Sequence, residues 1–251
     1  MKTFFSWLFL AYFFSSSAVL VLVAALVTLF ALPFDRNRRA VHYFASWWGF
    51  HYVQINPFWR CRMEGREHID PKKTYVIVAN HQSLSDIMVL YGLFRPYKWV
   101  SKESILKIPF IGLNMRLNQY VTLKRGDIKS IRDMMQVCRD WLNRGASLLM
   151  FPEGTRSEDG EIHDFRDGSF RLAAECHVPV VPIVISGTRE VLPKHSAKLN
   201  WKADIKVRVL PPINPDDFGG KAAPMRDYVH DLMKKTLAEM RNETKTLVAA
   251  S

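Results

Sequence analysis

A histidine and an aspartate five residues apart, His81 and Asp86, form the pattern most suggestive of chemistry in this sequence. They lie in the stretch NHQSLSD (80–86), directly after the apolar run Tyr75–Ala79. On a regular helix this spacing is a rotation of about 140°, so the two side chains would not meet. They can meet if His81 stays on a loop and Asp86 lies in the first turn of the next helix. The carboxylate would then orient the imidazole and leave its other nitrogen free as a general base toward a hydroxyl. The alternative is a capping histidine and an exposed aspartate at a helix start.

A second stretch, FPEGTRS (151–157), also follows an apolar run, SLLMF (147–151). Gly154 lies between the carboxylate of Glu153 and the guanidinium of Arg156. An arginine presents a planar fork that can hold a phosphate by two bonds, and backbone N–H groups of a glycine turn can add more. The alternative is a surface turn with a local Glu–Arg pair.

Further cations follow two more predicted strands. Lys102 comes after Lys98–Ser101, and Lys124 and Arg125 come after Tyr120–Leu123. Reactive groups of α/β proteins gather at the carboxyl ends of parallel strands, so neighbouring strands would bring these cations and His81 to one crevice. A base beside a phosphate cradle describes an enzyme whose nucleophile is a hydroxyl on a phosphorylated substrate.

The elements that must position these residues alternate along residues 59–251. Short apolar runs predict strands at 75–79, 98–101, 120–123, 147–151, 178–185 and 205–209, and helical patterns separate them at 83–94, 110–117, 128–144, 169–176 and 225–240. Strands separated by helices predict an α/β fold, with a largely parallel sheet flanked by helices. Pro182 lies inside a predicted strand, which indicates a bulge or an edge there.

The N-terminal segment has a different character, because no charged residue occurs from Thr3 to Phe34. As a helix, Phe4–Leu32 would be about 43 Å long at about 1.5 Å per residue, against a hydrocarbon core of about 30 Å. It can span the bilayer with tilt, or enter one leaflet and bend near its serines. A cleaved signal peptide is disfavoured, because the stretch is too long and no cleavage site leads into a polar start.

Charges and aromatic residues after this segment extend the membrane hypothesis. Arg36, Arg38 and Arg39 follow it, which predicts that the downstream domain lies on the cytoplasmic side. Aromatic residues recur at helical spacing through Arg36–Val53, which predicts a helix lying in the membrane interface; packing against the catalytic domain is the alternative. We therefore expect a membrane anchor and interfacial helix over residues 1–58 and a catalytic domain over residues 59–251.

Composition narrows the class of partner. The formal net charge is +11 over 251 residues, which suits nucleic acid or anionic lipid. No dense Lys/Arg run, zinc-finger spacing or aromatic–basic signature supports nucleic acid, and the apolar segment favours membrane lipid. Three widely spaced cysteines indicate neither a disulfide framework nor a metal site.

Four blocks, taken together, resemble the 1-acyl-sn-glycerol-3-phosphate acyltransferases, within the wider glycerolipid acyltransferases. They are NHQSLSD (80–86), the stretch from Lys102 to Arg125, FPEGTRS (151–157) and VPVVPIVISGT (178–188), in the family's order. The resemblance covers about residues 60–215. It departs at Gln119, where the family often has a glycine six residues before its arginine, so we expect a narrower pocket or a shifted headgroup there.

The resemblance implies a role for each site residue. His81 would deprotonate the sn-2 hydroxyl of 1-acyl-sn-glycerol-3-phosphate, with Asp86 orienting it, and the fourth block would help form the acyl-chain site. No cofactor or metal is implied; the acyl donor would be acyl-CoA or acyl carrier protein, and the product phosphatidate. Residues expected to hold the glycerol phosphate are Lys102, Arg125, Glu153, Gly154, Thr155 and Arg156.

Two alternatives remain open on the sequence. One is an acyltransferase for another acceptor, such as a lyso-aminolipid or another lysophospholipid. The other is a non-catalytic membrane-binding relative, which the intact His81, Asp86, Glu153 and Arg156 disfavour. The expected location is the cytoplasmic face of the inner (plasma) membrane.

Overall fold

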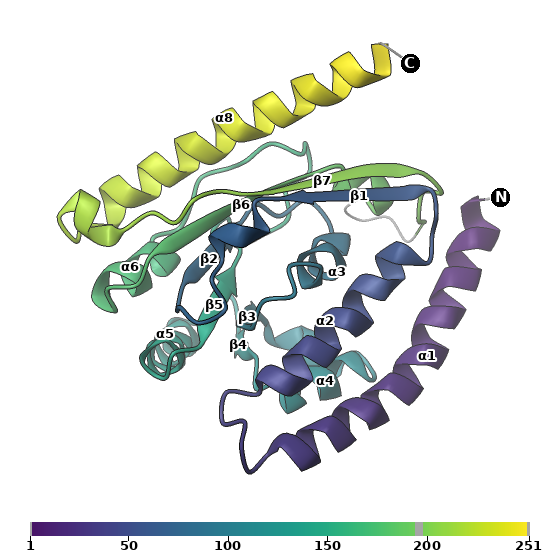
Figure 1. Cartoon of the computed structure of the whole chain (residues 1–251), viewed down its shortest axis with the longest axis horizontal. Helices are drawn as coiled ribbons and strands as arrows, with labels where there is room; N and C mark the ends of the chain where they lie inside the picture. The colour runs from purple at the N-terminus through teal and green to yellow at the C-terminus, as the bar shows by residue number, and fades with distance from the viewer. Residues whose placement is uncertain (1, 194–197, 250–251) are drawn as a thin grey trace.

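A sheet of seven strands forms the centre of the molecule, in the order β1-β7-β6-β2-β5-β3-β4 (Figure 1). The computed structural model describes residues 2–193 and 198–249. The strands are β1 (Trp59–Glu64), β2 (Val76–Ala79), β3 (Tyr97–Lys102), β4 (Val121–Leu123), β5 (Ser147–Met150), β6 (Val180–Ser186) and β7 (Ala203–Val209).

The predicted α/β fold with a largely parallel sheet is confirmed. Strands β6, β2, β5, β3 and β4 pair in parallel, β7 joins β6 antiparallel, and β1 pairs in parallel with β7. Sequences such as VIVA in β2 are apolar throughout and buried throughout, as expected for strands covered by helices on both faces. β1 was not predicted, because its sequence WRCRME alternates apolar with charged residues and one side of it stays accessible.

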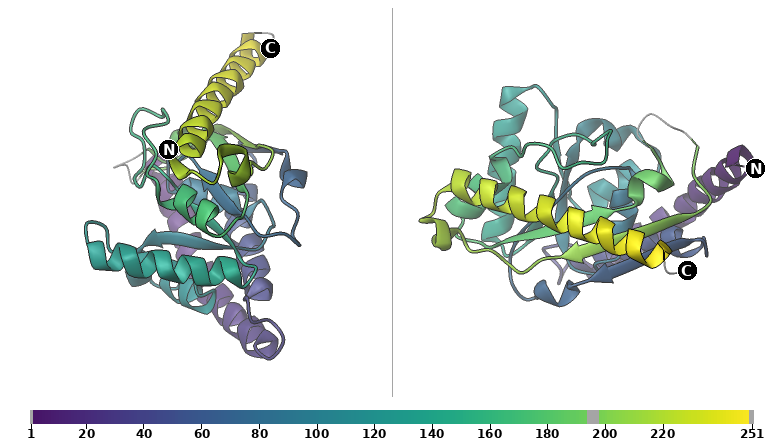
Figure 2. Two further views of the ribbon diagram at one scale, coloured as in Figure 1. Left: turned by 90° about the vertical axis from the view of Figure 1, so that its left-hand side faces the viewer. Right: turned by 90° about the horizontal axis from the view of Figure 1, so that it is seen from above.

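Helices cover both faces of the sheet (Figures 1 and 2). One face carries α5 (Ile128–Asn143), α6 (Gly168–Glu175) and α8 (Ala222–Ala249), which share a core with Val76, Val78 and Leu148. The other face carries α1 (Lys2–Ala31), α2 (Arg39–Gln54), α3 (Ser85–Tyr91), α4 (Ile111–Leu117) and α7 (Thr188–Val191). Three short 3₁₀ turns, η1 (Arg66–His68), η2 (Glu103–Lys107) and η3 (Pro215–Phe218), complete the described elements.

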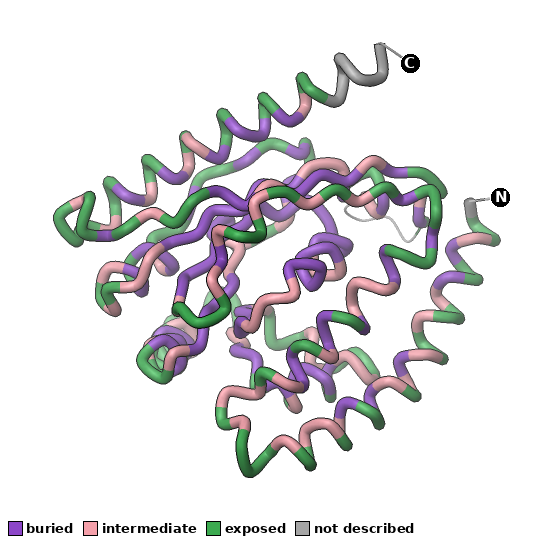
Figure 3. Tube along the Cα trace, viewed as in Figure 1, coloured by how far each residue is buried: buried purple, intermediate pink, exposed green. Residues whose placement is uncertain are grey.

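The first two helices form an antiparallel pair against the second face of the sheet (Figure 1). One side of α2 is buried against the domain, through Val41, Ala45, Trp48, Tyr52 and Val53. This is the packing that was considered as the alternative to a helix lying in the interface. On the same helix Tyr43 and Trp47 stay exposed. The segment Thr3–Ala31 of α1 is long and apolar enough to cross a membrane, with a mean hydropathy of 2.4. Its exposed face (Figure 3) includes Phe4, Trp7, Leu8, Val19, Leu22, Leu26, Leu29 and Phe30.

Pro182 lies in the interior strand β6, so the expectation of an edge was wrong. It pairs with Val78 of β2, and its carbonyl accepts the N–H of Leu210 at 2.9 Å. The regular antiparallel ladder with β7 stops at Ile183 and contact resumes only at the isolated bridge from Val180 to Ile213. The break in the ladder beside Pro182 accommodates a residue that has no N–H to donate.

Candidate active site

Four strand ends meet at one edge of the sheet. β2, β5, β3 and β4 are consecutive neighbours and run parallel, so the residues that follow their carboxyl ends lie along one edge. His81 follows β2, Glu153 follows β5, Lys102 ends β3 and Arg125 follows β4. The strand order therefore brings these four positions to the same edge of the sheet, as the sequence predicted.

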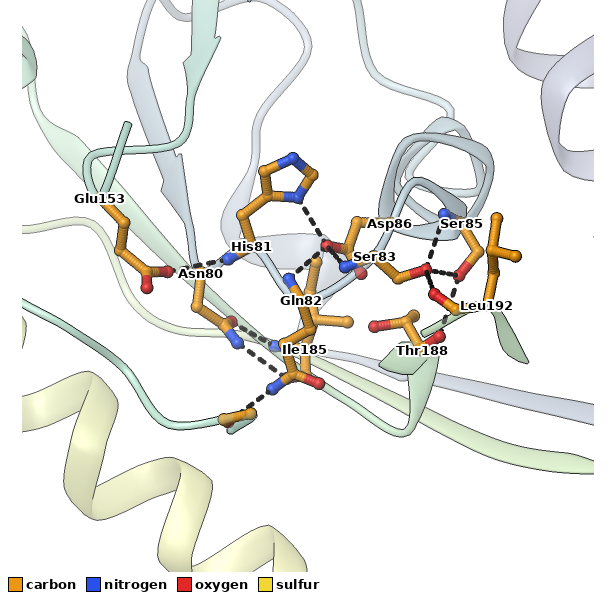
Figure 4. Close-up of polar contacts among 11 residues, drawn as sticks. Asn80, His81, Gln82, Ser83, Ser85, Asp86, Glu153, Ile185, Thr188 and Leu192 are labelled. Carbon is orange, nitrogen blue, oxygen red and sulfur yellow. Dashed lines mark hydrogen bonds and ion pairs between the residues drawn. The ribbon is translucent and has the colours of Figure 1, made fainter. Parts of the chain in front are cut away.

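His81 and Asp86 meet directly. His81 stays on the loop and Asp86 lies in the first turn of α3, the arrangement that the spacing required. The imidazole Nδ1 donates to Asp86 Oδ2 at 2.7 Å, and the second ring nitrogen points away from the carboxylate (Figure 4). That Nε2 has no hydrogen-bond partner among the described residues, so it is the atom free to accept a proton.

Asp86 is fixed by more than the histidine. Its Oδ2 also accepts the backbone N–H groups of Gln82 and Ser83, at 2.7 and 2.9 Å, and the residue is fully buried. Its Oδ1 has no hydrogen-bond partner in the described structure. Three donors on one oxygen hold the carboxylate in a single orientation, and that orientation sets the position of the imidazole.

Glu153 is bonded to the backbone of two segments of the site. Its Oε1 accepts the backbone N–H of His81 at 2.9 Å and its Oε2 accepts the N–H of His163 at 3.2 Å. It is buried, and burial raises its pKa to about 7. Oε1 thus positions the histidine loop and Oε2 the segment at His163, and the expected contact of Glu153 with the glycerol phosphate stays a prediction.

Two aromatic rings that sequence reasoning had not assigned to the site flank the histidine. Phe151 stacks on the His81 imidazole with ring centroids 3.9 Å apart and planes 12° apart, and Trp99 stacks on Phe151 with ring centroids 5.8 Å apart. The stack fixes the plane of the imidazole, as Asp86 fixes its rotation. Phe151 is the first residue of the block FPEGTRS. The spacing of that block does not predict which aromatic ring or imidazole Phe151 will contact.

The histidine loop is also bonded to the end of β6 and the chain after it (Figure 4). Asn80 exchanges two hydrogen bonds with the backbone of Ile185, at 3.0 and 2.7 Å, and Ser85 donates to the Thr188 carbonyl at 3.1 Å. From Val180 to Ile185 the side chains of β6 are fully buried in the sheet. The fourth block thus supports the catalytic loop, and its part in an acyl-chain site stays a prediction.

The cations form a group on the other side of the site. Burial first, and then the charges of Arg166 and Arg156, lower the pKa of Arg125. Gly154 has φ of +71°, which glycine adopts at no steric cost. Thr155 and Lys102 are exposed. Arg166 was missed by sequence reasoning, because it lies ten residues beyond Arg156 in a stretch without a recognised spacing.

Gln119 lies elsewhere than expected. It precedes β4, whereas Arg125 follows it, so the two residues lie at opposite ends of the strand and Gln119 cannot narrow the site. Its φ of +54° is in the left-handed region, where glycine is the least strained residue. The family's frequent glycine at this position is therefore explained by the positive φ of the turn between α4 and β4, and not by the space available in the pocket.

The site can therefore transfer a proton and hold an anion. It offers one free imidazole nitrogen, oriented by a buried carboxylate, beside several guanidinium groups. Among the described residues no group of three or more histidine, cysteine, aspartate or glutamate side chains is arranged to hold a metal ion.

Comparison with known proteins gives the class. The acyltransferase family model matches residues 60–186, just over half of the chain, and the chain belongs to this family. It is 38% identical over 229 residues to the chloroplastic 1-acyl-sn-glycerol-3-phosphate acyltransferase of Brassica napus, covering 90% of this chain and 64% of that protein. It is 40% identical over 214 residues to a 1-acyl-sn-glycerol-3-phosphate acyltransferase of Chlamydomonas reinhardtii, covering 83% and 62%. The chain thus spans somewhat under two thirds of the length of these relatives.

A solved structure resembles the whole fold. The crystal structure of the 1-acyl-sn-glycerophosphate acyltransferase PlsC from Thermotoga maritima superposes with a TM-score of 0.79 and 26% sequence identity, covering 96% of this chain and 98% of that one. The similarity extends beyond the family-model match to the N-terminal helices and to α8.

Proposed function

We propose that this protein is an O-acyltransferase that moves a fatty acyl group from a thioester to the sn-2 hydroxyl of 1-acyl-sn-glycerol-3-phosphate, giving phosphatidate. The observation that carries the proposal is the free Nε2 of His81, since its Nδ1 is bound to Asp86 at 2.7 Å. The names of the similar proteins agree with this substrate. No side chain of the site needs to form a covalent acyl intermediate, because the acceptor hydroxyl is itself the nucleophile.

The reaction follows from this geometry. His81 Nε2 takes the hydroxyl proton as the acceptor oxygen bonds to the thioester carbonyl carbon. The carbon–sulfur bond then breaks, and the thiolate that leaves takes the proton back from the imidazolium. Asp86 holds the Nδ1 proton throughout and stabilises the imidazolium, while the guanidinium groups of Arg125 and Arg156 hold the acceptor's phosphate.

An assay of the purified protein against a panel of acceptors tests the proposal. Lysophosphatidate should be the best acceptor, ahead of lyso-aminolipids and of lysophospholipids with a substituted phosphate. Acyl-CoA and acyl carrier protein thioesters supplied in parallel identify the donor. Turnover only with another lyso-lipid would show a different acceptor, and no turnover with any pair would leave a non-catalytic membrane protein.

We propose in addition that the protein works at the cytoplasmic face of the inner membrane, with residues 1–58 as the anchor. The support is the exposed apolar face of α1 and the arginines Arg36, Arg38 and Arg39 after it. Attachment through an apolar helix does not depend on charge, so high salt should leave the protein on membranes and detergent should release it. Full-length protein in the soluble fraction without detergent would contradict the anchor.

A further inference from the structure

The chain from Ser157 to His163 folds into a compact loop that its own side chains hold together. Asp159 Oδ1 accepts the Ser157 hydroxyl at 2.7 Å, and it also accepts the N–H of Glu161 at 2.9 Å and the imidazole Nε2 of His163 at 3.0 Å. The Ser157 hydroxyl oxygen in turn accepts the N–H of Gly160 at 3.0 Å. Because these bonds join most of the loop into one unit, a contact at one of its residues helps to fix the others.

This loop is bonded to the loop that carries the catalytic histidine at two points. The N–H of Ser157 donates to the His81 carbonyl at 2.7 Å, and the Gly160 carbonyl accepts Nε2 of Gln82 at 3.1 Å. The backbone N–H of Gln82 itself donates to Asp86 Oδ2 at 2.7 Å (Figure 4). The 157–163 loop is therefore connected to the base and, through Gln82, to the carboxylate that orients the base.

Arg241, on the last helix α8, holds the same loop. Its Nη2 donates to the Gly160 carbonyl at 2.7 Å, the same oxygen that Gln82 contacts, and its Nη1 pairs with Glu161 Oε1 at 2.6 Å. A charged donor makes a stronger hydrogen bond than a neutral one. Of the two side chains that position the Gly160 carbonyl, Arg241 therefore makes the stronger contact.

The helix that presents Arg241 is itself fixed on the sheet, across which it lies in Figure 1. One side of α8 is buried in the core on that face, through Met225, Val229, Met233, Leu237 and Met240. Met240 directly precedes Arg241 in the chain, so the guanidinium extends from a part of the helix that the core holds in place. The match to the family model ends at residue 186, and this support thus comes from outside the matched part of the chain.

We propose that Arg241 is a positioning residue for acyl transfer, which acts on the His81 base through the Gly160 carbonyl and Gln82. This inference rests on the proposed function, and it assigns a part in that reaction to the C-terminal helix. Arg241 touches neither the imidazole nor Asp86, so it does not take part in proton transfer itself. Because a general base works only when it is correctly placed, loss of Arg241 should lower kcat and leave KM near that of wild type.

Kinetics of the full-length, detergent-solubilised protein test the proposal. With lysophosphatidate, Arg241→Gln should lower kcat by about 10-fold and change KM by less than about twofold. Arg241→Lys keeps one charged donor in place of the planar fork, so it should recover part of the lost kcat.

Two matched variants test whether the contact with Gly160 is the one that matters. Glu161→Gln removes the ion pair of Arg241 but leaves its bond to the Gly160 carbonyl, so kcat should fall by less than about threefold. Arg226→Gln breaks an ion pair with Asp167 from the same helix, and kcat should stay at the wild-type value. A loss of kcat in Arg226→Gln equal to that in Arg241→Gln would show a general loosening of α8 and overturn the proposal.

A double variant tests the path through Gln82. Gln82→Met removes the second donor to the Gly160 carbonyl and should itself lower kcat. Because contacts within one network are not additive, Gln82→Met combined with Arg241→Gln should lose about as much kcat as the more impaired single variant. If the two losses multiplied, the residues would act independently and the proposed path would be wrong.

The two proposals fail in different ways. If the wild-type protein transferred no acyl group to any lyso-lipid, the proposed function and the role of Arg241 would fall together. If the wild-type protein used another lyso-lipid, the proposed acceptor would be wrong, and the same comparison of kcat with that acceptor would still decide the role of Arg241. An unchanged kcat in Arg241→Gln, or a change in KM alone, would overturn only the role of Arg241.

Discussion

Replacement of Glu153 by glutamine separates two roles for this residue, positioning of the loop that carries His81 and direct contact with the substrate. In the structure its two oxygens accept the N–H groups of His81 and His163, at 2.9 and 3.2 Å. Glutamine keeps one acceptor oxygen but turns an amide group toward the other N–H. The bond to His163 is then lost, and the loop that carries His81 is held by one contact fewer.

The magnitude follows from the burial of the carboxylate. Its pKa rises from 4.5 to about 7, which corresponds to about 3 kcal/mol at about 1.4 kcal/mol per unit. Because the folded-state pKa lies above the unfolded value, the folded state binds the proton more tightly, and stability is lost as pH rises from about 4.5 to about 7. Glutamine removes this loss, but the unpaired N–H costs about 1–3 kcal/mol at every pH.

Unfolding measurements on detergent-solubilised protein at pH 5 and pH 8 give the first result. Glu153→Gln should be less stable than wild type by about 1–3 kcal/mol at pH 5 and close to wild type at pH 8. The control is Glu161→Gln, which removes an exposed carboxylate paired with Arg241 and should show little such pH dependence. A stability difference that does not change between the two pH values would refute the reasoning.

Kinetics give the second result for the same variant. Positioning of His81 predicts that kcat falls by about 10-fold or more, while KM for lysophosphatidate stays close to wild type. Direct contact with the substrate predicts a changed KM instead. A changed KM with an unchanged kcat would contradict the positioning role and restore the contact that the sequence had suggested.

Three further predictions concern single residues. Asp86→Asn should lower kcat by about 100-fold or more without unfolding the protein, because the amide cannot stabilise the imidazolium; wild-type turnover in this variant would contradict the orienting role. Gln119→Gly should range from neutral to about 1 kcal/mol more stable in thermal unfolding, because relief of the positive φ offsets the greater freedom of glycine in the unfolded chain; a clear loss of stability would show that its side chain matters. Burial lowers the pKa of Lys98 to about 7, so wild-type stability should rise with pH between about 7 and 10.5, and Lys98→Met should remove this rise; equal pH profiles would disprove that assignment.

Much of the fold was predictable from local pattern. The buried strands β2, β5 and β6 are runs of apolar residues, and α5 begins where Asp127 caps the helix by accepting the N–H of Ser130 at 3.0 Å. β1 was missed because its charged residues obscure a strand that forms only by pairing with β7, far along the chain. The aromatic pattern of α2 is the same whether lipid or protein covers it; the structure packs one side of this helix on the domain and leaves Tyr43 and Trp47 exposed, so its place in the interface stays a prediction.

The site was predictable where position along a strand was enough. His81, Asp86 and Arg125 needed only the strand ends and the spacing, and the first two meet as the spacing required. The position of Glu153 was predictable, but its orientation was not, because the direction of a carboxylate depends on which backbone N–H groups lie nearby. Arg166 was missed for a related reason: its approach to Gly154 arises from the folding back of the segment 163–166.

The most direct test of the account is the single-turnover rate of acyl transfer to lysophosphatidate by His81→Ala. The account predicts a loss of at least about 100-fold, and up to about 10,000-fold, as is typical when a positioned general base is removed. The variant should remain folded with a moderately lower thermal midpoint, because His81 is buried and stacks on Phe151. A folded His81→Ala protein with a near-normal transfer rate would contradict the assignment of His81 as the base.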